Sequence, residues 1–400
     1  MINIAVLGYG TVGSGVVNVI ETNHSKVNQK STDEINVKYI LDLREFPGDP
    51  YESKVVHDFN TILEDGDIKI ICETMGGTKP AYDFTKSALL KGISVCTSNK
   101  ELVAQHGPEL IKIAKENNCN YMFEASVGGG IPIIRPLNSS LTSEDVDAIT
   151  GILNGTTNYI LTKMENEGAA FEDVLKKAQE LGYAEKNPEA DVEGYDAGRK
   201  IAILTSLMAG KNMKFENVYT EGITKITSKD FDYAKAMNRT IKLFGLSRKE
   251  NDEYYAMVSP FMVSKDHPMA MVNDVFNAIF VHGNTLGDTM YYGRGAGSLP
   301  TASAVVSDVI ECARNIGNNV PVFWDAEDVK IKGVDDITHK FFVRVSSDKK
   351  DAALRVFGNI ETVDSVVDGE FAFVTELMSE KNFKKSADEV SIISRIRLVD

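Results

Sequence analysis

The sequence predicts an α/β protein with an N-terminal doubly wound Rossmann domain, a middle α+β domain and a small C-terminal ferredoxin-like module. Three observations predict this. In the first third of the chain, strand-like apolar runs alternate with segments of helix length, which is typical of parallel sheets with helical crossovers. From about Ile131 the pattern becomes mixed. The last stretch, residues 337–400, has the order strand, helix, strand, strand, helix, strand, which is the ferredoxin-like order.

Length and composition fit a globular protein with several domains. The chain has 400 residues, more than one ordinary domain holds, and 43% of them are hydrophobic and 25% charged. The formal net charge is −15. Nucleic acids and anionic membranes bind basic surfaces, so we expect neither as a partner.

The start of the chain and its cysteines bear on the compartment. "MINIAVLGYG" runs into a strand-like pattern without a basic leader, and no apolar run reaches the roughly 18 residues of a membrane span. We therefore expect a cytoplasmic protein. Four cysteines, Cys72, Cys96, Cys119 and Cys312, lie far apart without a CxxC pair, which argues against a metal cluster or disulfides. Cys72 and Cys96 lie in apolar runs and are expected to be buried and inert.

The first domain is expected to cover residues 1–130. Its strands are predicted at 2–8, 35–43, 68–77, 93–98 and 120–126. Its helices are predicted from Thr11, near 80–92 and near 107–118. Each helix returns the chain to the start of the next parallel strand.

The middle domain is expected to cover residues 131–297. The predicted helices lie at 131–141, in the second half of 146–164, at 171–181 and at 196–209. The predicted strands lie in the first half of 146–164, at 253–263 and at 275–283. From Tyr291, "YYGRGAGSLP" predicts a glycine-rich loop that feeds a long helix, and we expect residues 298–325 to return to the first domain.

The first motif with chemical meaning is "VLGYGTVGSG". It has Gly8, Gly10 and Gly13 in G-x-G-x-x-G spacing between a strand and a helix. Such glycines let the backbone approach a pyrophosphate and direct helix N–H groups at its charge. The motif predicts a dinucleotide site that includes Thr11 and Val12; the alternative is a tight turn that binds nothing.

The cofactor preference stays open. Asp42, after the second strand, would accept hydrogen bonds from a ribose hydroxyl, which favours NAD. Arg44 would hold a 2′-phosphate, which favours NADP. Asp42 also lies farther from Gly13 than the roughly 20 residues usual for this acid.

Two further segments follow predicted strands. "VCTSNKELVA" places Thr97, Ser98 and Lys100 at the carboxyl edge of the sheet, where ligands bind; the alternative for Lys100 is a solvated position in the first turn of a helix. "FEASVGGGIPIIRP" joins Glu124 to three glycines. Its carboxylate and backbone carbonyls would suit a hard cation, and a structural hinge is the alternative.

Polar residues also precede two apolar helices. In "GILNGTTNYILTKM", Asn154 and Thr156 would cap the helix or hold a substrate carboxylate. In "YAEKNPEADVEGYDAGRK", residues 183–200, several carboxylates stand before Lys200. One explanation is helix-start chemistry with a surface i,i+4 ion pair between Asp196 and Lys200. The other is a site in which the lysine and its acids meet a substrate.

These motifs together resemble homoserine dehydrogenase, in particular the ACT-domain-bearing Gram-positive bacterial type. The resemblance covers residues 1–320 and rests on "GYGTVGSG", "TSNKELVA", "EASVGGGIPII", "GILNGTTNYILT", "LGYAE", "ADVEGYDAGRK" and "YYGRGAGSLPTASAVVSD", in that order. It implies reversible reduction of aspartate 4-semialdehyde to homoserine with NAD or NADP, on the route to threonine and methionine. It also implies a homodimer, with a homotetramer as the alternative.

The resemblance also implies roles for individual residues. Lys200 would be the catalytic acid/base, Lys100 a second active-site lysine, and Asp196 the residue that orients Lys200. The implied substrate-binding residues are Glu185, Asp191 and Thr156. The implied sodium site consists of Glu124, Val127, Gly129 and Ile131. The implied cofactor contacts beyond the first glycine loop are Asp42, Arg44, Thr97, Ser98, Lys100, Gly295 and Gly297.

Residues 337–400 resemble the ACT regulatory module. The usual acidic residue and Pro-Gly turn after the first strand are replaced by "SSDKKDAAL". Without the glycine, a tight amino-acid-binding turn is harder to form. This departure counts against threonine feedback and leaves support of oligomerisation as the other role.

Two other functions compete with this interpretation. Aspartate-semialdehyde dehydrogenase would need a cysteine nucleophile in an activating environment, which none of the cysteines has. A catalytically silent nucleotide sensor would have no need for both lysines and all the matching acids.

Overall fold

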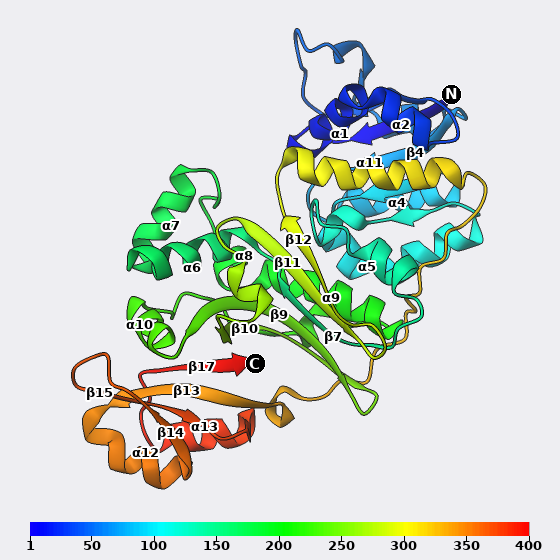
Figure 1. Ribbon diagram of the computed structural model, residues 1–400. Coiled ribbons are helices and arrows are strands. Elements are labelled where there is room, and N and C mark those ends of the chain that lie inside the picture. Colours follow the sequence, from blue (N-terminus) through cyan, green and yellow to red (C-terminus); the bar gives the residue numbers. More distant parts are fainter. Residues whose placement is uncertain (400) are drawn as a thin grey trace.

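The computed structural model describes residues 1–399 and has an N-terminal parallel sheet, a large mixed sheet and a C-terminal module that extends the large sheet (Figure 1). The N-terminal sheet has the order β3-β2-β1-β4-β5-β6, and all its paired strands are parallel. Its strands are β1 (Ile2–Leu7), β2 (Ile35–Leu41), β3 (Val55–Val56), β4 (Ile68–Glu73), β5 (Ser94–Thr97) and β6 (Tyr121–Met122). This order is that of a Rossmann fold and confirms the predicted doubly wound domain.

Helices cover both faces of this sheet. The helices are α1 (Thr11–Thr22), α2 (His24–Lys30), α3 (Phe59–Leu63), α4 (Ala81–Leu90), α5 (Lys100–Glu116) and α11 (Ser298–Arg314). Buried residues of α1 and α11 share one core with β1 and β4, while α4 and α5 share another with the opposite sides of the same strands. The long helix α11 thus returns to the first domain, as the sequence predicts.

The predicted start of α5 is wrong. The helix begins at Lys100, not near Gly107, because Asn99 caps it by accepting a bond from the Leu102 N–H at 3.1 Å. Pro108 lies inside the helix. The Gly107–Pro108 pair resembles a helix start in sequence, but this helix tolerates it in its interior. Lys100 therefore occupies the first helical turn beside the carboxyl edge of the sheet.

The large sheet carries the middle domain, with helices on one face. Its order is β12-β11-β7-β9-β10-β17-β13-β15-β14. The strands of the middle domain are β7 (Val146–Ile152), β8 (Tyr219–Thr220), β9 (Arg239–Glu250), β10 (Glu253–Ser264), β11 (Phe276–Gly283) and β12 (Gly287–Arg294). The helices are α6 (Gly155–Glu167), α7 (Phe171–Glu180), α8 (Glu189–Val192), α9 (Tyr195–Ala209) and α10 (Ser228–Ala236). Helices α6 and α9 pack on the sheet, and α9 also contacts α5 (Figure 1).

One predicted loop is partly a strand. The glycine-rich loop expected from Tyr291 is wrong over its first four residues, since β12 continues to Arg294. This strand lies at the sheet edge, pairs with β11 alone among residues 1–399, and alternates between partly exposed and exposed residues. Its side chains lack the apolar alternation that marks half-buried strands, so the sequence does not reveal it.

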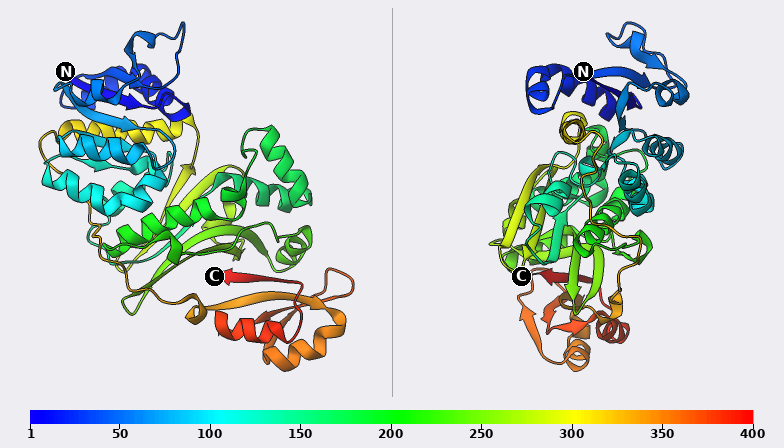
Figure 2. Two further views of the ribbon diagram at one scale, coloured as in Figure 1. Left: turned by 180° about the vertical axis from the view of Figure 1, so that it is seen from behind. Right: turned by 90° about the vertical axis from the view of Figure 1, so that its right-hand side faces the viewer.

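The C-terminal module has the predicted order of elements apart from one additional two-residue strand, β16, which pairs with β13. It contains β13 (Thr338–Ser346), α12 (Lys350–Phe357), β14 (Ile360–Val363), β15 (Glu370–Thr375), β16 (Met378–Ser379), α13 (Glu380–Asp388) and β17 (Ser394–Val399). Asp400, the last residue of the predicted module, lies outside the described residues. The sequence does not predict that β17 pairs in parallel with β10, which makes one continuous sheet from the middle domain and the module (Figure 2).

No helix within residues 1–399 is long and apolar enough to cross a membrane. All four cysteines are free and buried. Burial raises the pKa of the Cys119 thiol to about 12 and also raises the pKa of Cys72 far above its ordinary value. The Cys72 and Cys119 thiols are therefore protonated at neutral pH and are not activated nucleophiles.

Candidate active site

The two lysines that the sequence singles out meet at one aspartate. Asp196 lies in the first turn of α9 and is 5% exposed. Its carboxylate accepts a hydrogen bond from Lys200 Nζ at 2.8 Å and forms an ion pair with Lys100 Nζ at 2.6 Å. Lys200 Nζ also donates to the carbonyl oxygen of Leu153 at 2.8 Å. Asp196 thus joins α5 of the first domain to α9 of the middle domain.

The charges of this centre stabilise one another. Burial alone would raise the pKa of Asp196, but the positive charges of Lys200 and Lys100 outweigh burial and hold that pKa below its ordinary value. Burial lowers the pKa of Lys100, but Asp196 more than offsets this, and the net shift is upward. Asp196 and Lys100 are therefore both charged at neutral pH.

Asn154 connects the partly exposed Asp191 to the buried Asp196. Its side-chain oxygen accepts a bond from the Thr157 N–H at 2.9 Å and caps α6. Its Nδ2 atom donates to Asp191 Oδ1 at 2.7 Å and to Asp196 Oδ2 at 2.9 Å. The sequence predicts that Asn154 caps the helix or contacts the substrate carboxylate, but it does not predict this bridge between the two acids. Burial, partly offset by the bond from Asn154, raises the pKa of Asp191.

A glycine sets the angle between the two acidic segments. Gly194 separates α8 from α9 and has φ = 83°, a left-handed conformation that costs other residues energy. A Cβ atom there would lie 2.9 Å from Val258 Cγ1 on β10. The turn lets Asp191 in α8 and Asp196 in α9 reach the same Asn154 side chain.

Thr156 and Glu185 lie at the edge of this centre. The Thr156 hydroxyl donates to the carbonyl oxygen of Tyr183 at 2.6 Å, which ties the start of α6 to the loop after α7. Glu185 is exposed on that loop, and its backbone carbonyl accepts a bond from Gln179 Nε2 at 3.0 Å. The structure therefore brings Lys100, Lys200 and Asp196 into direct contact, whereas Glu185 lies on an exposed neighbouring loop.

The glycine-rich loop after β1 fits closely against its own backbone. A Cβ atom on Gly13 would lie 1.8 Å from the Gly8 carbonyl oxygen, so only glycine fits there, whereas one on Gly10 would meet no atom within 4 Å. The Ser298 hydroxyl donates to the Thr11 carbonyl oxygen at 2.6 Å. This bond brings the preceding residue, Gly297, to the same loop.

The residues that would select the cofactor line one cavity. It has a volume of about 450 Å³ and is bordered by Gly8, Asp42, Arg44, His57, Phe59, Met75 and Phe84, among others. Asp42 accepts bonds from Arg44 Nε at 2.9 Å and from Arg44 Nη2 at 2.8 Å, and it also accepts one from the Tyr9 N–H at 2.8 Å. The Arg44 guanidinium holds the pKa of Asp42 below its ordinary value.

The loop before Lys100 is fixed by a carboxyl group that sequence reasoning missed. The Thr97 hydroxyl is buried and donates to Glu73 Oε2 at 2.6 Å, while Ser98 next to it is partly exposed. Burial raises the pKa of Glu73 to about 7, although bonds from Thr97 and Met75 oppose this. The signal in the sequence is an acidic residue that ends the apolar strand "IKIICE". Thr97 thus contacts Glu73, and the partly exposed residues of this segment are Ser98 and Lys100.

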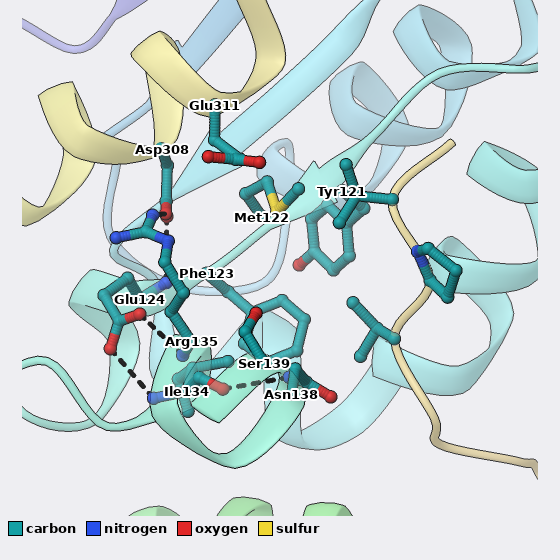
Figure 3. Close-up of a pocket in the computed structure, with 13 residues that line it drawn as sticks. Tyr121, Met122, Phe123, Glu124, Ile134, Arg135, Asn138, Ser139, Asp308 and Glu311 are labelled. Carbon is teal, nitrogen blue, oxygen red and sulfur yellow. Dashed lines mark hydrogen bonds and ion pairs between the residues drawn. The ribbon is translucent and has the colours of Figure 1, made fainter. Parts of the chain in front are cut away.

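Glu124 holds the segment that follows the three glycines. Its carboxylate accepts bonds from the backbone N–H groups of Ile133, Ile134 and Arg135 at 2.5, 2.8 and 2.8 Å. Figure 3 shows this cluster beside Arg135, which pairs with Asp308 of α11 at 2.6 Å. Gly295 packs on the same glycines, since a Cβ on Gly129 would lie 2.2 Å from its carbonyl oxygen.

Comparison with protein families gives two matches along the chain. The model described as "Homoserine dehydrogenase, NAD binding domain" matches residues 8–124. The model described as "Homoserine dehydrogenase" matches residues 132–310. The matches cover the parallel sheet after β1 and most of the middle domain, including the lysine–aspartate centre.

Individual proteins give the same result. The homoserine dehydrogenase of Bacillus subtilis is 41% identical over 318 residues, which are 79% of this chain and 73% of that protein. The crystal structure of a homoserine dehydrogenase from Thiobacillus denitrificans superposes with a TM-score of 0.92 at 34% identity, covering 100% of this chain and 98% of that one. A hyperthermophilic archaeal homoserine dehydrogenase in complex with NADPH has a TM-score of 0.67 at 29% identity, covering 78% and 97%.

Proposed function

The chain belongs to the homoserine dehydrogenase family, and on that premise we propose that the centre formed by Lys200, Lys100 and Asp196 is its catalytic site. As a family member it is an NAD(P)-dependent oxidoreductase that interconverts aspartate 4-semialdehyde and homoserine. The observation that carries the proposal is the single buried carboxylate in contact with both lysines. Burying a cation without an anionic partner is costly. Asp196 is that partner for both lysines, and its contacts hold the two ammonium groups in defined positions.

Lys200 is the proposed proton donor and acceptor. A bound nicotinamide cofactor supplies or accepts the hydride. When a hydride reaches the aldehyde carbon, negative charge develops on the oxygen, and a nearby ammonium stabilises it and delivers a proton. An ammonium has three N–H donors, and the bonds to Asp196 and to the Leu153 carbonyl use two of them. The third remains for the substrate oxygen.

The remaining acids and the start of α6 are proposed to bind the ends of the substrate. Homoserine is a zwitterion, so its ammonium needs carboxylates and its carboxylate needs donors. Asp191, bonded to Asn154, and the exposed Glu185 supply negative charge. Thr156 lies in the first turn of α6, where unpaired helix N–H groups favour an anion.

We propose that Asp42 and Arg44 set the cofactor preference through their mutual pairing. An adenosine 2′-phosphate would compete with Asp42 for the Arg44 guanidinium, whereas the hydroxyls of an unphosphorylated ribose would donate hydrogen bonds to the Asp42 carboxylate as it stands. Both cofactors are therefore expected to work. The archaeal relative binds NADPH, which is consistent with use of a 2′-phosphorylated cofactor.

The prediction is tested by Arg44→Ala with initial rates of homoserine oxidation, followed as NAD(P)H absorbance. We expect the KM for NADP to rise about tenfold or more, since a charge-assisted pair is lost, and the KM for NAD to stay close to wild type. The surface variant Lys69→Ala is the control. Equal changes for both cofactors would contradict the assignment.

We propose that sodium binds at Glu124, Val127, Gly129 and Ile131. The last three are buried, and no hydrogen bond among residues 1–399 ends on their backbone carbonyl oxygens. Buried carbonyls without donors suit a hard cation. The Glu124 carboxylate, occupied by three N–H groups, adds negative charge.

Sodium dependence gives the second prediction. Replacing sodium by a large organic cation at constant ionic strength should lower both the thermal midpoint and the homoserine oxidation rate, because a cation that binds only the folded state stabilises it. Rates and midpoints that do not respond to sodium would rule the site out.

The boundaries and assembly are part of the same proposal. We propose a cofactor domain of residues 1–130 and 298–325, a catalytic and dimerisation domain of residues 131–297, and an ACT-like module of residues 337–400. The edge strand β12 supports dimerisation through the middle domain, since Met290 and Tyr292 are 36% and 54% exposed on it, and exposed apolar residues on an edge strand favour association. A tetramer joined by the modules is the alternative.

A further inference from the structure

Two fully buried arginines tie the C-terminal module to the middle domain. Arg344 and Arg397 are 2% and 0% exposed. Arg344 binds Asp230 of α10 at 2.7 Å and Glu370 at 2.8 Å. Arg397 binds Glu221 at 2.8 Å and pairs with Glu380 at 2.5 Å, and it donates to the Ser259 hydroxyl. Each arginine therefore has one acidic partner in the module and one in the middle domain.

The Arg397 cluster lies where two short strands meet on one edge of β10. Strand β8 pairs with β10 through Tyr219 and Met257, and β17 pairs farther along through Arg397 and Phe261. Glu221 follows β8 directly, and its backbone N–H donates to the Val258 carbonyl at 2.8 Å. Its carboxylate accepts bonds from Arg397 and, at 3.0 Å, from Arg395.

The segment after Glu221 is packed against the acidic end of the active site. The Ile223 N–H donates to the Val192 carbonyl at 2.9 Å, and the Thr224 hydroxyl donates to Glu193 Oε1 at 3.0 Å. A Cβ atom on Gly222 would lie 2.2 Å from the Val192 carbonyl oxygen. Only glycine at position 222 permits so close a contact. A shift of this segment must therefore move Val192, which is next to Asp191.

From these contacts we infer that Glu221 and Arg397 are positioning residues for Asp191. Arg397 and Arg395 hold the Glu221 carboxylate, and β10 holds the Glu221 backbone. The three residues that follow Glu221 pack against Val192 and Glu193. The C-terminal module is thereby part of the scaffold that sets the substrate-binding acid. Removing either Glu221 or Arg397 deprives the other of a buried ion-pair partner, which is costly. We expect residues 221–224 to shift as a result. The inference rests on the proposed role of Asp191 in binding the substrate ammonium.

The test compares the full-length enzyme with Arg397→Met, Glu221→Gln and a matched control, Arg344→Met. Both arginines are buried, belong to the same module and pair across the same junction, but Arg344 binds α10, which carries none of the proposed site residues. We expect Arg397→Met and Glu221→Gln to raise the KM for homoserine roughly tenfold, a coupling that packed networks transmit. The KM for the cofactor should not change.

The KM separates positioning from loss of folded protein. Partial unfolding lowers the amount of active enzyme and hence the apparent kcat, but it leaves the KM of the remaining enzyme unchanged. Arg344→Met should lower the thermal midpoint as Arg397→Met does, with an unchanged KM. If Arg397→Met does not fold, Glu221→Gln decides, since it keeps the side-chain volume.

A fourth variant, Asp191→Asn, separates the two levels of the proposal. A higher KM in Asp191→Asn with an unchanged KM in Glu221→Gln overturns the inference and keeps the substrate role of Asp191. Equal KM changes in Arg344→Met and Arg397→Met overturn it as well. An unchanged KM in Asp191→Asn overturns the substrate role and this inference with it.

Discussion

Replacing Lys200 by alanine is expected to lower kcat for homoserine oxidation by about 10²- to 10⁴-fold, the usual contribution of a positioned general acid or base. In the structure, the Lys200 ammonium is held by Asp196 and by the Leu153 carbonyl, with its side chain only 12% exposed. Alanine removes both the stabilising charge and the proton carrier. The measurement is the initial rate with NAD and with NADP in parallel.

Two further variants make the Lys200 result specific. Lys200→Arg keeps the positive charge, but an arginine does not give up its proton near neutral pH, so its rate separates charge stabilisation from proton transfer. Lys211→Ala removes an exposed lysine that pairs with Glu327 and should leave kcat unchanged. A folded Lys200→Ala enzyme with a kcat within tenfold of wild type would remove Lys200 from the mechanism.

Local patterns predicted much of the fold. The alternation of strands and helices in the first third led to the observed parallel sheet, since crossovers of one hand leave few ways to arrange such elements. The strand and helix order of residues 337–399 was also predicted, apart from the short strand β16. Two parts of the fold were not predicted. Strand β12 lacks the apolar pattern that would reveal it, and the pairing of β17 with β10 joins segments that are distant in the sequence.

The same division applies to the site. The i,i+4 spacing of Asp196 and Lys200 is visible in the sequence and survives as the bond between them. The sequence alone favours a surface pair about as strongly as a site. Burial of Asp196 argues against a surface pair, and the catalytic role stays a proposal. The contact of Lys100 with Asp196 and the bridge by Asn154 join three separate segments. The buried Thr97 hydroxyl donates to Glu73. A local motif cannot indicate this contact, because the two residues are distant in the sequence.

Asp196→Asn is the variant with the second large expected effect, and it acts on stability as well as rate. It leaves two lysines facing each other without the carboxylate that both contact. Removing one partner of a buried ion pair costs roughly 3–5 kcal/mol, and the lower end applies here because the Lys100 side chain is 37% exposed. We expect a loss of about 3 kcal/mol in the free energy of unfolding, and a fall in kcat because Lys200 loses its fixed position. Urea denaturation followed by circular dichroism measures the first, and initial rates measure the second.

The dependence of this loss on pH identifies its cause. In the wild type, the lowered pKa of Asp196 and the raised pKa of Lys100 keep both groups charged, so the stability from the pair is constant between about pH 5 and pH 9. It falls only below the unfolded aspartate pKa or above the unfolded lysine pKa. In Asp196→Asn, Lys100 loses the carboxylate that raises its pKa, so burial and the nearby Lys200 charge should lower the pKa of Lys100, although Asp191 limits this. The native state then binds fewer protons than the unfolded state, and stability rises with pH from about 7 to 10. The deficit relative to wild type should therefore shrink as pH rises; a deficit of constant size would mean that lost packing, and not repulsion between the lysines, destabilises the variant.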